Sequence, residues 1–105
     1  MVNVVAHRGF SGKFPDNTAV AFKEALALGV EMIELDVHLA NDGSLIVIHD
    51  ATVDRTSDGT GRVATLSLDK IKGMDAGSWF DPSFKGEQFL VLGEALDLIG
   101  DKVKL

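Results

Sequence analysis

Two histidines and two carboxylates in this sequence are residues of the types, and at the spacing, that phosphate-ester chemistry needs. His7 and His49 each end an apolar run, and Glu34 and Asp36 lie two residues apart in an alternating segment. Histidine titrates near neutral pH, so a pair of histidines can serve as general base and general acid. Arg8 follows the first histidine, and its guanidinium can bind two phosphate oxygens. A surface ion pair is the alternative role for Arg8.

The carboxylates of Glu34 and Asp36 point to the same side if the segment is a strand. They are then roughly 6.5–7 Å apart along the chain. Two such carboxylates repel each other unless a cation lies between them, solvent screens them or they share a proton. Oxygen ligands without cysteine suit Ca²⁺ or Mg²⁺ better than Zn²⁺. The alternative is that both residues, with His38, form only the solvated face of an antiparallel edge.

The elements that would position these residues follow from apolar periodicity and cap residues. Val2 to His7 predicts a strand that is followed by a loop. A helix is predicted to begin after Asn17 or Thr18 as its N-cap and to end at Gly29. This is the order strand, loop, helix.

The segment from Met32 to Ala40 alternates strictly and predicts one strand. One face carries Ile33, Leu35, Val37 and Leu39, and the other carries Glu34, Asp36 and His38. Residues 41–43 (Asn-Asp-Gly) predict a turn, and Leu45 to Ile48 predicts a second strand. The short turn suggests a hairpin, but the second strand could also run back along a barrel, so its direction stays open.

The remaining segment, from Ala51 to Leu92, has an irregular pattern with one short amphipathic helix at Leu68 to Lys72. We interpret it as a long excursion, and excursions of this length are usually functional or packed on themselves. A helix is predicted from Leu92 to Ile99, closed by Gly100, and a strand from Val103.

Composition limits the class of protein. The 105 residues are 46% hydrophobic and 25% charged, which is typical of one globular domain. The net charge of −6 makes nucleic acid an unsuitable partner, since phosphate binding there needs clustered Lys and Arg. No apolar run approaches the ~20 residues of a membrane span, so stable membrane insertion is not expected. Without a signal-peptide pattern, the expected location is cytoplasmic.

Several motifs in order resemble one family, the glycerophosphodiester phosphodiesterases, which are more distantly related to phosphatidylinositol-specific phospholipases C. The motifs are Ala6-His7-Arg8-Gly9, Pro15-Asp16-Asn17-Thr18, Ile33-Glu34-Leu35-Asp36-Val37, Val47-Ile48-His49-Asp50, Thr52-Val53-Asp54-Arg55-Thr56, Gly59-Thr60-Gly61 and Asp75-Ala76-Gly77-Ser78-Trp79-Phe80. The separation of Glu34 from His49 is also that of the family.

The resemblance implies a TIM barrel with its site at the C-terminal ends of the strands. Residues 1–105 would form a single partial domain, about half a barrel with the family's insertion at about 51–92. The resemblance implies that His7 and His49 are the acid–base pair and that Arg8 contacts phosphate. It implies that Glu34 and Asp36 bind a divalent cation, Ca²⁺ or Mg²⁺.

The reaction implied by the resemblance is hydrolysis of small glycerophosphodiesters to glycerol 3-phosphate and an alcohol. The glycerol 2-hydroxyl would attack phosphorus, the alcohol would leave, and water would open the cyclic phosphate while the histidines exchange roles. His38 matches none of the family's catalytic residues. The sequence leaves the preferred head group and the identity of the metal open.

The sequence departs from the family pattern in two ways. Asp16 stands where the family usually has Glu. A TIM barrel needs about 250 residues, and a later family strand with another acidic ligand and a lysine is not among these 105. The alternatives are therefore a non-catalytic half barrel that keeps the motif residues, or a lipid phosphodiesterase related to phospholipases C or D. A half barrel is expected to associate with itself as a dimer.

Overall fold

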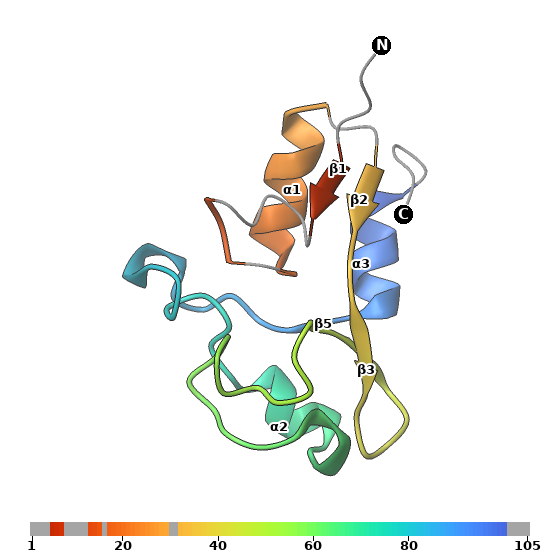
Figure 1. Ribbon diagram of the computed structural model, residues 1–105, viewed down its shortest axis with the longest axis vertical. Coiled ribbons are helices and arrows are strands. Elements are labelled where there is room, and N and C mark those ends of the chain that lie inside the picture. Colours follow the sequence, from red (N-terminus) through yellow and green to blue (C-terminus); the bar gives the residue numbers. More distant parts are fainter. Residues whose placement is uncertain (1–4, 8–12, 16, 30–31, 101–105) are drawn as a thin grey trace.

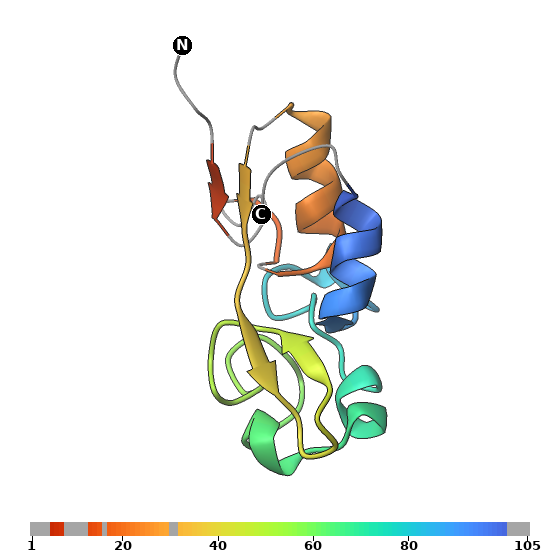
Figure 2. The ribbon, with the colours of Figure 1, turned by 90° about the vertical axis from the view of Figure 1, so that its right-hand side faces the viewer.

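The computed structural model describes residues 5–7, 13–15, 17–29 and 32–100. Strands β1 (Val5–His7) and β2 (Met32–Glu34) form a parallel pair at one end of the molecule. Helices α1 (Ala19–Ala27) and α3 (Leu92–Ile99) lie side by side against this pair (Figures 1 and 2). A strand, a helix and a parallel strand form the unit from which α/β barrels are built.

Cap residues determine both ends of α1. The Thr18 hydroxyl accepts the Ala21 N–H at 3.4 Å, which identifies Thr18 as the N-cap of the two candidates. Gly29 follows the helix with a φ of +74°, as the sequence predicts. Asn17, the other candidate, has a left-handed φ of +59° and turns the chain into the helix.

A first hydrophobic cluster joins the two helices to the strands. Its buried members are Phe22, Ala25, Ile33, Val47, Ala95 and Ile99. Burying a large apolar side chain stabilises the folded state by about 1.5–3 kcal/mol. The cluster therefore holds α1 and α3 on the β1–β2 pair, whose carboxyl ends carry the predicted site residues.

The predicted strand from Met32 to Ala40 is two strands with different partners. β2 pairs with β1, and β3 (Val37–Leu39) pairs with β4 (Leu45–Val47). The predicted apolar face does not stay in the core, because Val37 is 38% and Leu39 57% exposed. The prediction of one continuous strand is therefore wrong. Alternation shows which side chains share a face of a strand, but it does not show with which sheet the strand pairs.

The sequence leaves open the direction of the strand after the turn, and the structure shows a hairpin. β3 and β4 are antiparallel, and the Ala40 N–H donates to the Ser44 carbonyl at 2.8 Å across the turn. β5 (Leu90–Val91) pairs with the other edge of β4, also antiparallel. These three strands form a second small sheet.

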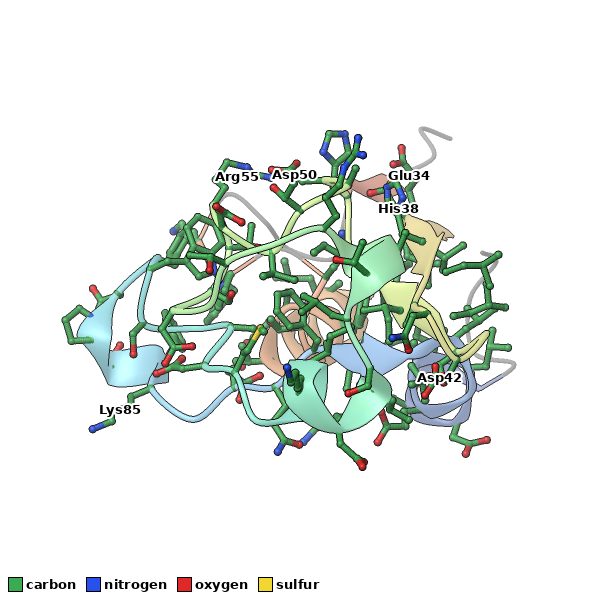
Figure 3. All side chains as sticks on the ribbon, turned by 90° about the horizontal axis from the view of Figure 1, so that it is seen from below. Glu34, His38, Asp42, Asp50, Arg55 and Lys85 are labelled. Carbon is green, nitrogen blue, oxygen red and sulfur yellow. The ribbon has the colours of Figure 1, made fainter. Side chains whose placement is uncertain are left out.

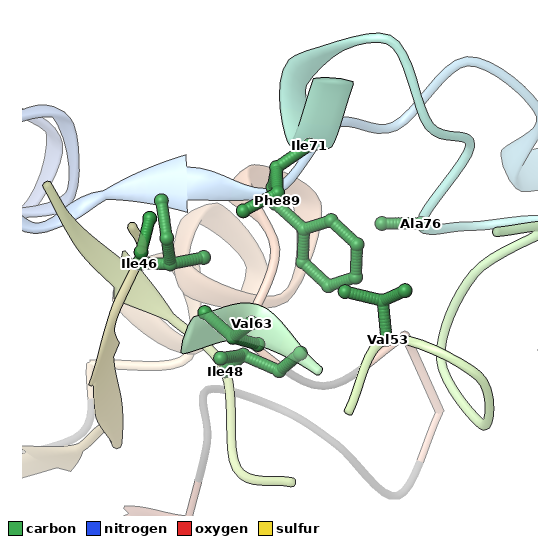
Figure 4. Close-up of a cluster of buried hydrophobic side chains, with 8 residues drawn as sticks. Ile46, Ile48, Val53, Val63, Ile71, Ala76 and Phe89 are labelled. Atoms are coloured by element: carbon green, nitrogen blue, oxygen red, sulfur yellow. The ribbon is translucent and has the colours of Figure 1, made fainter. Parts of the chain in front are cut away.

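The segment between β4 and β5 packs on this sheet. It contains α2 (Leu68–Lys72), at the predicted position, and 3₁₀ turns at Val63–Thr65 and Pro82–Phe84. A second buried cluster joins it to the hairpin, and its members are Ala40, Ile46, Ile48, Val53, Val63, Ile71, Ala76 and Phe89 (Figure 4). The excursion and the hairpin therefore form one hydrophobic core together, separate from the first cluster.

Polar contacts connect the excursion to the helices. Glu87 accepts the N–H of Val20 in the first turn of α1 at 3.2 Å, and Lys72 of α2 forms an ion pair with Glu94 of α3. The strand predicted from Val103 lies outside the described residues. Within the described part of the chain, no helix is long and apolar enough to cross a membrane.

Candidate functional site

Among the described residues, Glu34 is the one predicted site residue that can be placed on an edge of the molecule with its polar neighbours (Figure 3). In the parallel pair, the Cα atoms of His7 and Glu34 are direct partners at the carboxyl ends of their strands. Glu34 and His38 lie on the same edge as Asp50 and Arg55 (Figure 3). The side chain of His7 and the whole of Arg8 lie outside the described residues, so their predicted roles stay predictions.

The start of α1 contacts one of the two carboxylates. Glu34 is exposed and Asp36 is half-buried. Asn17, only 2% exposed, donates its side-chain N–H to Asp36 Oδ2 at 3.4 Å. The backbone of Asn17 is left-handed, a conformation that asparagine adopts more readily than most residues. The segment that caps α1 therefore also contacts Asp36.

A cation would find hard oxygen donors at this position. No group of three or more His, Cys, Asp or Glu that could hold a metal ion occurs in the part of the chain that the structure describes. Glu34 and Asp36 are only two carboxylates, and the chemistry of their oxygens suits Ca²⁺ or Mg²⁺. The Asn17 Oδ1 atom is buried and has no hydrogen-bond partner. The cation predicted from the sequence stays a prediction.

Hydrogen bonds that involve the backbone connect the segment of His49 to the segment of Asp36 and His38. The Ile48 N–H donates to the Asp36 carbonyl at 2.9 Å. The His38 Nε2 atom is 2.9 Å from the His49 carbonyl, and a carbonyl only accepts, so Nε2 carries the hydrogen. The sequence predicts His38 only as a member of the polar face, and the structure adds a role in holding His49.

The side chain of His49 forms one end of a hydrogen-bonded chain. Its Nδ1 atom is 2.8 Å from Asp50 Oδ1. Arg55 donates to both oxygens of Asp50, from Nε to Oδ2 at 2.8 Å and from Nη2 to Oδ1 at 3.1 Å. The Arg55 guanidinium, helped by His49, lowers the pKa of Asp50 to about 2. Asp50 is therefore an ionised acceptor at neutral pH.

Asn17, Asp50 and Arg55 were not predicted as site residues. Asp50 and Arg55 stand inside the motifs that carry the family resemblance, five residues apart, but spacing alone cannot show that their side chains meet. Asn17 also stands inside one of these motifs, but the sequence predicts for it only the role of a helix cap. The burial and the contact with Asp36 that give it a second role depend on the packing of α1 against β2.

Comparison with known proteins identifies the family. Residues 7–105 match the model of the glycerophosphoryl diester phosphodiesterase family. A glycerophosphodiester phosphodiesterase of Caldanaerobacter subterraneus subsp. tengcongensis is 54% identical over 99 residues, which is 94% of the chain and 41% of that protein. One from Bacillus subtilis is 41% identical over 104 residues, covering 91% of the chain and 36% of that protein. The chain thus spans about two-fifths of these relatives.

Solved structures match the fold over the same extent. A glycerophosphodiester phosphodiesterase from Agrobacterium tumefaciens superposes with a TM-score of 0.95 at 43% identity, covering 98% of the chain and 45% of that protein. An Oleispira antarctica phosphodiesterase, in complex with the product sn-glycerol-3-phosphate, gives 0.92 at 36% identity, covering 97% and 41%. The predicted fold class, part of a TIM barrel, is confirmed. The chain belongs to the glycerophosphoryl diester phosphodiesterase family.

Proposed function

We propose that the chain supplies the acid–base and cation-binding residues of a phosphodiesterase that hydrolyses glycerophosphodiesters to glycerol 3-phosphate and an alcohol. The observation that carries the proposal is the hydrogen bond of His49 Nδ1 to Asp50, which leaves the Nε2 atom to act on a substrate. The backbone of the preceding residue, Ile48, is hydrogen-bonded to that of Asp36. The Oleispira relative, whose complex contains sn-glycerol-3-phosphate, supports the product.

In the proposed reaction His49 and His7 transfer protons at phosphorus. One imidazole removes the proton of the glycerol 2-hydroxyl as its oxygen forms a bond to phosphorus. The other protonates the alcohol oxygen as the bond between that oxygen and phosphorus breaks. The roles then reverse, and water opens the cyclic phosphate. The side chain of His49 is 45% exposed and can therefore reach a bound phosphodiester.

A protein with a net negative charge needs positive charge at its binding site to bind an anionic phosphodiester. The net charge is −6, and we assign the local charge to Arg8 and to a divalent cation held by Glu34 and Asp36. When bound, the cation would neutralise charge on the phosphoryl oxygens and lower the pKa of the attacking hydroxyl. The hydrogen bond from Asn17 would help to orient the Asp36 carboxylate for this role.

The test uses a completed barrel, in which the chain is continued by the remainder of the Caldanaerobacter relative. With glycerophosphocholine and Ca²⁺ or Mg²⁺, ³¹P spectra are expected to show glycerol 3-phosphate, and a chelator is expected to stop its formation. Failure to form glycerol 3-phosphate with either ion would refute the proposed reaction.

The cation ligands are tested separately by calorimetric titration of both ions. The Glu34→Gln/Asp36→Asn double variant is expected to bind at least about tenfold more weakly, since two charged ligands are lost. A control pair, Glu24→Gln/Asp97→Asn, removes the same charge from the exposed faces of α1 and α3. Identical isotherms for the site variant and the wild type would refute the assignment.

A further inference from the structure

We infer that Asp50 and Arg55 are positioning residues that fix the tautomer of His49, so that the segment after β4 orients the proposed acid–base group. The inference rests on the proposed function for the catalytic role of His49. The hydrogen bonds that fix the ring exist independently of any reaction.

The tautomer follows from what each atom can donate. An ionised carboxylate only accepts hydrogen bonds, so the contact of 2.8 Å between Asp50 Oδ1 and His49 Nδ1 requires the hydrogen on Nδ1. The neutral ring then has its lone pair on Nε2, where it can accept a proton. The protonated ring has its transferable proton at the same atom. In both states Nε2 is the reactive position.

Arg55 prevents the carboxylate from turning away. Its two donations occupy both oxygens of Asp50 in a bidentate pair, which restricts rotation of the carboxylate more than one bond does. The guanidinium lies 5.7 Å from the centre of the Trp79 ring. The Trp79 Nε1–H donates to the carbonyl of Ala76 at 2.8 Å, and Ala76 belongs to the second hydrophobic cluster.

These contacts connect the core of the excursion to the imidazole. They run from the buried Ala76 through the indole and the guanidinium to Asp50 and His49. A purely structural ion pair is the competing explanation. The side chains of Arg55 and Asp50 are 46% and 27% exposed, and exposed ion pairs contribute little to stability. A role in positioning therefore predicts a change at the ring without a comparable loss of stability.

The test reads the tautomer directly, by long-range ¹H–¹⁵N spectra of the completed barrel with ¹⁵N-labelled histidine. The spectra are recorded where they show the ring to be neutral, and the His49 signals are assigned with His49→Gln. The wild type is expected to carry its hydrogen on Nδ1. Asp50→Ala is expected to move the population toward Nε2–H, the form that free imidazole side chains favour, and Arg55→Gln to move it part of the way.

The same variants are assayed for turnover and thermal unfolding. Asp50→Ala is expected to lower kcat by roughly 10- to 100-fold, by analogy with the loss of hydrogen-bond partners of metal-binding histidines. KM should change little, since both carboxylate oxygens of Asp50 already have protein partners. Arg55→Lys, which keeps the charge and one donor, is expected to retain more turnover than Arg55→Gln. Asp69→Ala and Arg62→Gln are exposed controls.

A wild-type ring with its hydrogen on Nε2 would overturn the inference, as would a His49 spectrum unchanged by Asp50→Ala in a folded variant. The inference would also be overturned if Asp50→Ala lowered kcat, and lowered the unfolding temperature, no more than the control Asp69→Ala does. A wild type with the expected tautomer and no turnover would refute the proposed function and support the positioning role.

Discussion

Substitutions of Asn17 can distinguish two effects of this residue. One is the energetic cost of its left-handed backbone, and the other is the hydrogen bond from its side chain to Asp36. Asn17→Gly keeps the left-handed φ of +59° accessible and removes the amide that donates to Asp36. The bond is long, at 3.4 Å, so we assign it about 1 kcal/mol, the usual net value of a hydrogen bond and below that of one to a charged group. If this energy holds Asp36 in its binding orientation, its loss raises the Kd for the cation about fivefold.

Stability should respond differently from cation binding. Losing the hydrogen bond costs about 1 kcal/mol, but removing the unpaired buried Oδ1 recovers about 1–3 kcal/mol of desolvation. Greater chain entropy of glycine in the unfolded state offsets part of that gain. We therefore expect the free energy of unfolding of Asn17→Gly to lie within about 1 kcal/mol of the wild-type value. Asn17→Ala should be less stable than Asn17→Gly by about 1 kcal/mol, because alanine disfavours the left-handed region.

The assay pairs calorimetric titration of Ca²⁺ and Mg²⁺ with urea unfolding in the presence of a chelator, on the completed barrel. Asn17→Gly and Asn17→Ala should bind the cation with the same reduced affinity, although their stabilities differ. Asn41→Ala, in the exposed hairpin turn, is the control. Wild-type cation affinity in Asn17→Gly would refute the role of the amide in orienting Asp36.

Three further predictions concern the excursion and the assembly. Gly77→Ala should destabilise the completed barrel by about 3 kcal/mol in urea unfolding, because its Cβ would lie 1.9 Å from the Phe84 carbonyl oxygen; a loss below about 0.5 kcal/mol would contradict this. The Ser78 hydroxyl and neighbouring N–H groups lower the pKa of Asp75 to about 2, so its stabilising contribution is present above the ordinary value of 3.8 and is lost as pH falls toward 2; urea midpoints of Asp75→Asn should fall less over this range than those of the wild type, and equal falls would contradict it. The 105-residue polypeptide by itself should self-associate in sedimentation at micromolar concentration, because β1 and β2 pair only with each other among the described residues; a strictly monomeric species would contradict it.

The helices could be predicted from the sequence because their signals are local. Thr18 and Gly29 delimit α1, and the predicted segments at 68–72 and 92–99 are those of α2 and α3. A side-chain cap, a left-handed glycine and a period of 3.6 residues all depend on neighbours within a few positions. These elements therefore need little information from the rest of the fold.

The sheets could be predicted only in part, because strand pairing is not local. The alternation from Met32 to Ala40 is real, but the chain leaves the β1 pair after Glu34 and enters the hairpin at Val37. Nothing in a period of two residues marks such a change of partner. β5 has only two residues, Leu90 and Val91, too short for a pattern.

The same distinction applies to the site. The types and spacing of Glu34, Asp36 and His49 identified them as candidates from the sequence alone. The side chains that hold them were missed or given other roles, because the contacts from Asn17 to Asp36 and from Arg55 to Asp50 depend on tertiary packing.

The measurement that tests the central claim most directly is the rate of glycerol 3-phosphate release by the completed barrel and its His49→Ala variant, at saturating glycerophosphodiester and divalent cation. We predict that kcat falls by at least ~10²-fold, the scale of a lost general acid or base, with an unchanged unfolding temperature. Because His38 donates to the His49 carbonyl, His38→Ala should cause a smaller fall. A His49→Ala variant that retains kcat within about tenfold of the wild type would contradict the account.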